Sequence, residues 1–523
     1  MPEAVNILIG VGGTGAKAVE AALVCFAAGC GPRHVHVGLV DQDQSNGNIA
    51  RTGQLLDRLV AFRAAWTRDR NHNYVDWEVP GDLPAVGSVS VSPLFGNTAL
   101  WCPEKDTATL KTILGGDIKG ERAHLFDLLF IPGEREKEKD KEQDLKLREG
   151  YRGNAHVGAT ALVAAMLDSE STIEATLRTL MTDAQGRRIN IFIVGSAFGG
   201  TGAAGFPTLA RALHRIRTSE DFTHGKNVTL GGMLLLPYFS FTDDAPEGEV
   251  VVASTDLLPK AQLALEYYHN LFQHEKALDR FYALGWEHLI PLGYNKPGTE
   301  EQCNPAMPPE LFAATAALDF FANEDPVDPD VGATNVMISA RQDARIKWRD
   351  IPGARAIEGG IGRLLRFCVY WRYIAEVDIG EKRAFLRGKN WIQELAGGSK
   401  PTDSEAELNP TRLVIDHVLE WAATVEYMDQ TRWLDGPWKL SDFVTRTDSK
   451  TRPVQLNLNL TRGDAKRGFD ELVRLDGGEY NPRAGGDIYD GLENRAIKVN
   501  NQSKGLGVAL ATVMKAVALE GAN

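Results

Sequence analysis

Two glycine-rich loops, each placed between an apolar strand and a helix, constrain the fold of this chain more than any other feature. The first is GVGGTG at residues 10–15, which follows an apolar strand at residues 5–10. The second is GSAFGGTGAAG at residues 195–205, which follows an apolar strand at residues 190–194. Strand, glycine turn and helix in this order predict a parallel α/β sheet. Two such units can hold a polyphosphate from two sides, because each helix N-terminus directs N–H groups and a positive dipole end at it.

The rest of the pattern extends this sheet and then changes character. The 523 residues exceed what one hydrophobic core usually serves, so we expect two domains: a Rossmann-like parallel-sheet nucleotide-binding domain at 1–322 and a mainly helical C-terminal domain at 323–523. Residues of about 45–149, which are less regular and end in a charged run, are interpreted as an insertion. Further strands are expected at 34–40, 228–236 and 288–292, and helices at 16–28, 156–167, 206–217, from 263 to at least 270, 309–322, 363–376 and 413–427.

Composition excludes several classes of protein. A net charge of −13 argues against general nucleic-acid binding, which requires excess Lys and Arg to neutralise phosphates. The five cysteines are scattered without zinc-like spacing and are interpreted as reduced packing residues. The N-terminus lacks the basic region of a signal peptide, and no apolar run approaches the roughly 20 residues needed to cross a bilayer. We therefore expect a cytoplasmic protein without a membrane partner.

Six segments of the chain, in the same order, resemble the motifs of the tubulin/FtsZ superfamily, and the closest likeness is to bacterial, that is prokaryotic, tubulin-like proteins. The second glycine loop is similar to the tubulin signature loop, although Phe198 stands where a glycine is usual. The first loop is similar to the first phosphate loop of FtsZ. The other four segments are DQDQ at 41–44, GYRGNAHVG at 150–158, GMLLLPYF at 232–239 and LIPLGYN at 289–295.

The resemblance implies a protein that binds a guanine nucleotide, GTP or GDP, with Mg²⁺ bridging phosphate oxygens. Gly153 and Asn154 would sense the γ-phosphate, Asn295 would read the guanine edge, and Phe312 would stack on the base or be an ordinary core residue. The resemblance also implies that residues of the two glycine loops and of the DQDQ segment contact the phosphates or the rest of the nucleotide. These residues are Gly12, Gly13, Thr14, Gly15, Asp43, Gly199, Gly200, Thr201 and Gly202.

In the superfamily, an acidic loop after the central helix enters the nucleotide site of the next subunit and helps hydrolysis. Here Asn323, Asp325 and Asp328 match the pattern NxDxxD, with Phe320 in place of the leading glycine. An acidic proline-rich linker would look the same, so hydrolysis is left open. The resemblance implies head-to-tail self-association into an oligomer or filament. A protein partner of the C-terminal domain is also expected, without an indication of its identity.

Three other interpretations fit parts of the chain. An ATP-dependent adenylating enzyme of the ubiquitin-activating type would use the first glycine loop, Asp41 with Asp43, Ser45 with Asn46, and Arg51 placed on the phosphates. It would have no need of the second glycine loop. A NAD-binding dehydrogenase would use only the first loop and an acidic ribose ligand. A scaffold with a tubulin-like fold that does not hydrolyse GTP differs from the first interpretation only in activity.

Overall fold

The computed structural model describes most of the first 376 residues and two further stretches. The described residues are 3–66, 89–103, 108–114, 119–130, 142–151, 153–167, 172–184, 186–220, 222, 224–241, 254–292, 302–323, 334–341, 354–376, 405–429, 438–470 and 472.

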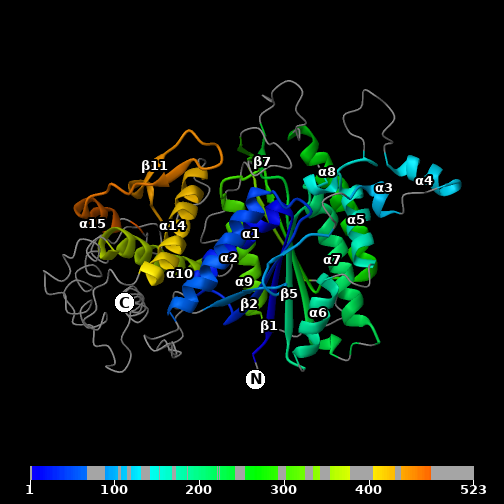
Figure 1. The fold of residues 1–523 in the computed structure, drawn as a ribbon, viewed down its shortest axis with the longest axis horizontal. Coiled ribbons are helices and arrows are strands. Elements are labelled where there is room, and N and C mark those ends of the chain that lie inside the picture. The colour runs from blue at the N-terminus through cyan, green and yellow to red at the C-terminus, as the bar shows by residue number, and fades with distance from the viewer. Residues whose placement is uncertain are drawn as a thin grey trace.

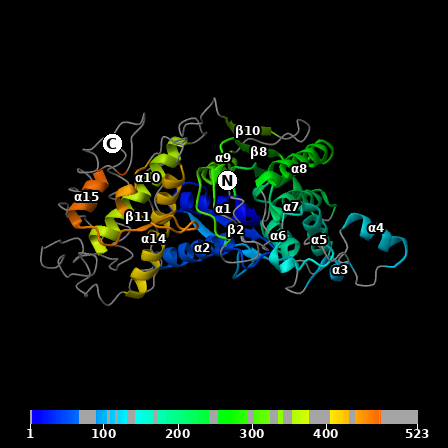
Figure 2. The ribbon, with the colours of Figure 1, turned by 90° about the horizontal axis from the view of Figure 1, so that it is seen from above.

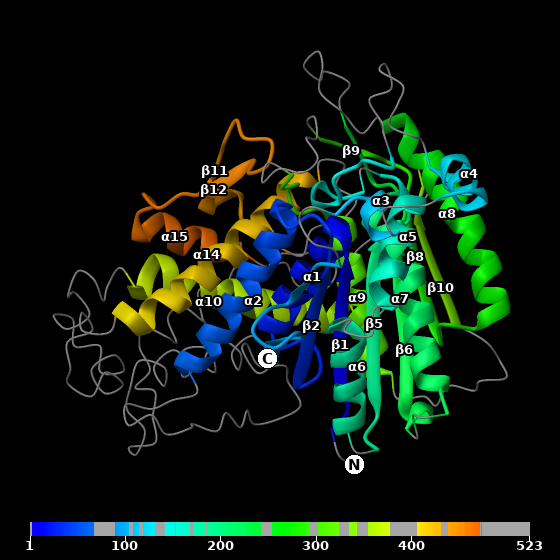
Figure 3. The same ribbon diagram turned by 45° about the vertical axis from the view of Figure 1, so that its right-hand side comes forward.

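A parallel sheet forms the centre of the molecule (Figure 1). Its strands follow the order β10-β8-β6-β5-β1-β2-β3, and the short β4 also pairs with β2. Strands β1 and β5 are fully buried along their lengths, as expected of a parallel sheet that is covered on both faces. Figure 3 shows these strands side by side. Their bounds are β1 Val5–Val11, β2 His34–Val40, β3 Ser90–Pro93, β4 Leu100–Trp101, β5 Ile189–Ser196, β6 Val228–Leu235, β8 Arg280–Trp286 and β10 Thr334–Ala340.

Helices cover both faces of the sheet, and two neighbouring glycines of β6 show which helix lies on which face. A Cβ atom on Gly231 would meet the ring of Phe320, whereas one on Gly232 would meet the ring of Phe206. Phe320 belongs to α9 (Pro308–Ala322), which packs on α1 (Gly12–Ala27) on one face, and α1 in turn packs on α2 (Gly47–Trp66). Phe206 belongs to α7 (Gly200–Thr218), which packs with α5 (Ala155–Leu167) and α8 (Ser254–Glu275) on the other face.

The C-terminal part is built mainly from helices and lies beside α2 at one end of the molecule (Figure 2). Helix α14 packs along α2, and α10 contacts α1, so the buried apolar side chains form one continuous cluster across both parts. At the opposite end lie the short helices α3 (Leu110–Ile113) and α4 (Glu121–Leu129). The C-terminal elements are α10 Ala354–Tyr370, a π-helical turn at Trp371–Ala375, α14 Glu405–Met428, α15 Arg462–Asp470 and an antiparallel pair, β11 Val444–Arg446 with β12 Val454–Leu456.

The predicted α/β class and the parallel sheet are confirmed, but several elements differ from the expectation. Part of the region interpreted as irregular forms α2, and the strand β8 was not anticipated. The segment expected as a strand at 288–292 is only the two-residue β9 (Ile290–Pro291), which pairs with β7 (Phe239–Ser240). The sheet also continues beyond residue 322 through β10. No helix in the described ranges is long and apolar enough to cross a membrane.

Candidate functional site

A cleft opens at the carboxyl ends of the central strands, where both glycine loops meet. It has a volume of about 840 Å³, including space that is open to solvent. Strand β1 lies between β2 and β5. The chain therefore adds β2 and β3 on one side of β1, and later adds β5, β6, β8 and β10 on its other side. Such a reversal of strand order separates the flanking loops and creates the crevice in which α/β proteins bind ligands. The cleft therefore lies where the topology predicts a ligand.

The first glycine loop brings the N-terminus of α1 into the cleft. Gly12, Gly13 and Thr14 line it, and Gly12 has a φ of +75°, which favours glycine. A Cβ atom at Gly12 would lie 3.0 Å from the backbone nitrogen of Gly202, so the two loops are in direct contact. Gly15 has a different role: a Cβ atom there would lie 2.5 Å from the carbonyl oxygen of Val194, and the glycine lets α1 pack closely on β5.

The second loop places the N-terminus of α7 on the same cleft. Gly199 is the N-cap residue and makes no side-chain cap, so the first N–H groups of α7 are left available to a ligand. Gly200 packs against the segment at Tyr151, since a Cβ atom on it would lie 2.9 Å from Gly153 N and 3.1 Å from Tyr151 Cβ. Two helix N-termini thus converge on one cleft, where their dipoles and N–H donors favour an anion.

Two carboxylates lie at the end of β2 in the same cleft. Asp41 and Asp43 are 2% and 3% exposed. Asp41 Oδ1 accepts hydrogen bonds from Thr201 Oγ1 at 2.9 Å and from the backbone nitrogen of Asp43 at 3.2 Å, while Asp43 Oδ1 accepts one from Ser45 Oγ at 2.6 Å. Burial, together with the neighbouring Asp43 carboxylate, raises the pKa of Asp41 to about 7. The site therefore has a carboxylate that an added cation would stabilise.

This raised pKa predicts how stability depends on pH. The folded state holds the Asp41 proton up to about pH 7, whereas the unfolded chain loses it near the ordinary aspartate pKa of 3.8. Asp41 therefore makes folding less favourable as pH rises between these two values. In Asp41→Asn the amide oxygen should still accept the Thr201 hydrogen bond, but the side chain carries no charge at any pH. The free energy of unfolding of the variant, compared with that of the parent, should therefore be higher by about 2–4 kcal/mol at neutral pH than it is at acid pH. Denaturant titration of both proteins at about pH 5 and about pH 8 measures this difference; equal pH slopes would contradict it.

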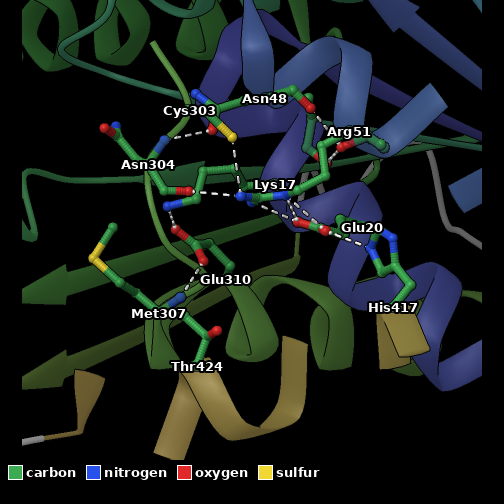
Figure 4. Close-up of polar contacts among 12 residues, drawn as sticks. Lys17, Glu20, Asn48, Arg51, Cys303, Asn304, Met307, Glu310, His417 and Thr424 are labelled. Carbon is green, nitrogen blue, oxygen red and sulfur yellow. Dashed lines mark hydrogen bonds and ion pairs between the residues drawn. The ribbon is translucent and has the colours of Figure 1, made fainter. Parts of the chain in front are cut away.

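Lys17 supplies a cation to the lining of the cleft. It lies on α1, is 2% exposed, and forms an ion pair with Glu310 of α9 (Figure 4). Glu310 is held by further hydrogen bonds from Tyr238 Oη at 2.6 Å and from the Met307 backbone nitrogen at 2.6 Å. Burial lowers the pKa of Lys17, and the Glu310 carboxylate opposes this shift. An ammonium group has three N–H donors, so one ion pair leaves donors for a ligand in the cleft.

Amide side chains form the remaining polar wall. Asn46 and Asn48 lie over Gly13, and Gln302 and Asn304 come from the segment that precedes α9. Asn48 Oδ1 accepts a hydrogen bond from the Asn304 backbone nitrogen at 2.9 Å, which joins the two groups. An amide offers both a donor and an acceptor, so this wall can recognise a polar ring edge or a sugar hydroxyl.

The structure brings most of the predicted nucleotide-binding residues together. The cleft is lined by Gly12, Gly13, Thr14, Asp43, Gly153, Gly199, Gly200, Thr201 and Gly202. Phe198, the departure from the tubulin signature, also lines it and packs edge-on against Phe239.

Other predicted residues lie elsewhere. Phe312 is a core residue, 2% exposed and packed edge-on against Trp286, so the stacking role is not supported by its position. Asn154 follows Gly153 and does not line the cleft; its carbonyl accepts from Gly158 N at the start of α5. Asn323 ends α9 at the opposite edge of the sheet, where its carbonyl accepts from Arg188 just before β5. Asn295, Asp325 and Asp328 lie outside the described residues.

Lys17, Tyr151 and the amides Asn48, Gln302 and Asn304 were not predicted from the sequence, and Asn46 was considered only within the adenylating-enzyme pattern. One signal was present for Lys17: it stands with Glu20 in a helix whose other residues from Ala16 to Ala27 are apolar and buried. A charged residue in such a helix is seldom buried unless it is paired or binds a ligand. The polar segment at 302–304 has no periodicity that would have marked Gln302 or Asn304.

Comparisons of the chain with models of protein families, with curated proteins and with solved structures gave no match. Among the described residues, no group of three or more His, Cys, Asp or Glu side chains is arranged to hold a metal ion. The fold and the site therefore define a class only: a parallel α/β domain with a polar cleft at its strand-order reversal.

Proposed function

We propose that this protein binds a nucleoside di- or triphosphate, and specifically a guanine nucleotide, in the cleft between α1 and α7. The observation that carries the proposal is the convergence of two glycine-rich helix N-termini on one cleft that also contains Lys17. A single helix N-terminus serves one phosphate group, whereas two that face the same space suit a chain of phosphates. The glycines let the backbone N–H groups approach the phosphate oxygens without side-chain obstruction.

Lys17 and the two aspartates would meet different parts of the ligand, Lys17 the phosphates and the aspartates a bound cation. Lys17 neutralises part of the phosphate charge directly. Asp41 and Asp43 are the residues that would hold Mg²⁺, because Mg²⁺ is usually bound by one or two carboxylates together with phosphate oxygens and water. The raised pKa of Asp41 fits this assignment, since a bound cation would offset the repulsion between the two buried carboxylates.

The adenylating-enzyme alternative loses its phosphate-binding arginine. Arg51 is not among the residues that line the cleft, and its guanidinium donates to Glu20 and to the Asn304 carbonyl. A preference for guanine over adenine follows from the resemblance to tubulins, and the amide wall is the feature that would read the base. Whether the protein is a GTPase or a scaffold that only binds GTP depends on Asp325 and Asp328.

The position of Asn323 supports a head-to-tail mode of self-association. The nucleotide cleft lies at the carboxyl ends of the strands, and Asn323 lies at their amino ends. A subunit with a nucleotide site at one end and the end of α9 at the other can stack on copies of itself, and such a contact extends into filaments unless it is capped.

Titration calorimetry of the purified full chain with GTP, GDP, ATP and NAD, each with Mg²⁺, tests the proposal. We expect GTP and GDP to bind with at least about tenfold higher affinity than ATP, which corresponds to about 1.4 kcal/mol. Equal affinities would remove the guanine assignment, and the absence of binding by all four would remove the nucleotide site. Sedimentation in the same solutions reports self-association, for which we expect larger species with GTP than with GDP.

A further inference from the structure

A network of hydrogen bonds and ion pairs connects the wall of the nucleotide cleft to the C-terminal helices. It begins at Arg51 of α2, which holds the segment just before α9 (Figure 4). Arg51 NH1 donates to the carbonyl oxygen of Asn304 at 2.9 Å and lies 3.3 Å from Cys303 Sγ. Asn304 itself lines the cleft. A change at Arg51 would therefore move a wall of the cleft although Arg51 does not line it.

The other edge of the Arg51 guanidinium is fixed by Glu20 of α1. Nε donates to Glu20 Oε1 at 2.9 Å and NH2 donates to Oε2 at 2.7 Å, which is a two-point contact that only arginine provides. Glu20 is 1% exposed. Burial alone would raise the pKa of Glu20, but Arg51 and His417 outweigh it and hold that pKa at about 2. The carboxylate is therefore ionised and depends on both partners.

The second partner of Glu20 comes from the C-terminal part of the chain. His417 of α14 lies 2.8 Å from Glu20 Oε1 through Nε2 and 3.2 Å from Arg58 NH1 through Nδ1. These contacts fit a neutral imidazole that donates from Nε2 and accepts at Nδ1. His417 is 8% exposed and Glu20 is 1% exposed, whereas the Arg51 side chain is 19% exposed and Asn304 is partly buried. The path from α14 therefore leads from buried groups to the wall of the cleft. Contacts between α14 and α2 surround it.

We propose that Arg51 is a positioning residue of the nucleotide cleft and that the C-terminal helix α14, through His417 and Glu20, sets its geometry. This inference rests on the proposed function. If docking of α14 holds Asn304 in the arrangement that binds the ligand, then ligand binding must in turn strengthen the docking of α14, because coupling between two sites is reciprocal. A partner that engages the C-terminal helices would thereby change nucleotide affinity, and nucleotide would change the affinity for that partner.

The test compares His417→Leu, His417→Gln, Arg51→Lys and Val418→Ala with the parent protein by calorimetry with guanine nucleotide. His417→Leu should weaken binding at least about fivefold, and His417→Gln, whose amide can still donate to Glu20, should stay within about twofold of the parent. Arg51→Lys keeps the positive charge but loses the planar guanidinium that makes two hydrogen bonds to Glu20, and it should weaken binding as much as His417→Leu does. Val418 is buried on the same helix outside the network, so Val418→Ala should lower the unfolding midpoint and leave the affinity unchanged.

Hydrogen exchange of the 405–428 segment provides the reciprocal measurement, and its first comparison, the parent protein with and without nucleotide, needs no variant. Added guanine nucleotide should slow exchange in α14, and Arg51→Lys should abolish that effect. If the parent binds no nucleotide, the proposed function itself is wrong. If the parent binds nucleotide while His417→Leu binds equally well, or while exchange in α14 does not respond, the coupling alone is wrong.

Discussion

Gly200→Val should weaken nucleotide binding about a hundredfold or more, because position 200 is where the second loop has no room for a side chain. A Cβ atom there would already lie 2.9 Å from Gly153 N and 3.2 Å from Gly153 Cα, and valine adds two methyl groups. The segment at 151–153 or the start of α7 must then shift, which withdraws N–H donors from the phosphates. Loss of two hydrogen bonds to a charged group costs about 3 kcal/mol or more, which is about a hundredfold in affinity.

Two further glycine variants make this result interpretable. Gly200→Ala introduces only the Cβ atom and should give a smaller loss of affinity than valine. Gly53→Ala, in the middle of α2, is the matched control: a Cβ atom there would meet nothing within 4 Å, so this variant should bind normally and gain about 0.5–1 kcal/mol of stability. Calorimetry and thermal unfolding of all three proteins are required. Parent-like binding by Gly200→Val would mean that the ligand does not use this loop.

The sequence predicted the centre of the sheet well, because the central strands of a parallel sheet are continuous apolar runs. Strands β1, β2, β5 and β6 have this pattern, and each was expected within two residues of its observed ends. Strand β8 has arginine, glycine and tryptophan in the sequence RFYALGW, and only part of it is buried. Helix α2 begins with glycine and asparagine and has a low mean hydropathy, so its pattern resembled a loop.

The sequence predicted mainly those parts of the candidate site that are formed by the backbone of the glycine loops. Glycine loops between strands and helices place N–H groups by local geometry, so their residues could be identified one at a time. Lys17, Asn304 and His417 act through partners that are distant in sequence: Lys17 meets Glu310, and His417 meets Glu20 after a separation of 397 residues. Such pairs depend on how α9 and α14 dock on α1, which local patterns do not encode.

Lys17→Met should show the largest loss of stability among these variants. It removes the cation from a buried ion pair and leaves the Glu310 carboxylate in the interior with only the hydrogen bonds from Tyr238 and Met307. Removing one partner of a buried pair costs about 3–5 kcal/mol, because the remaining charge is no longer compensated. Denaturant unfolding of the free protein measures this loss. It would occur whether or not Lys17 has any role in binding a ligand.

A second substitution separates the two roles of Lys17. In Lys17→Met combined with Glu310→Gln, no buried charge is left alone, and the glutamine can still accept from Tyr238, so most of the lost stability should return. Nucleotide affinity should nevertheless stay at least about tenfold below that of the parent, since the phosphate has lost a charged donor. Glu310→Gln alone should show the reverse, with lower stability but retained affinity, because the ammonium is then directed only at the ligand. If the double variant binds nucleotide like the parent, Lys17 is a structural partner of Glu310 and the phosphates are held by the two helix N-termini alone.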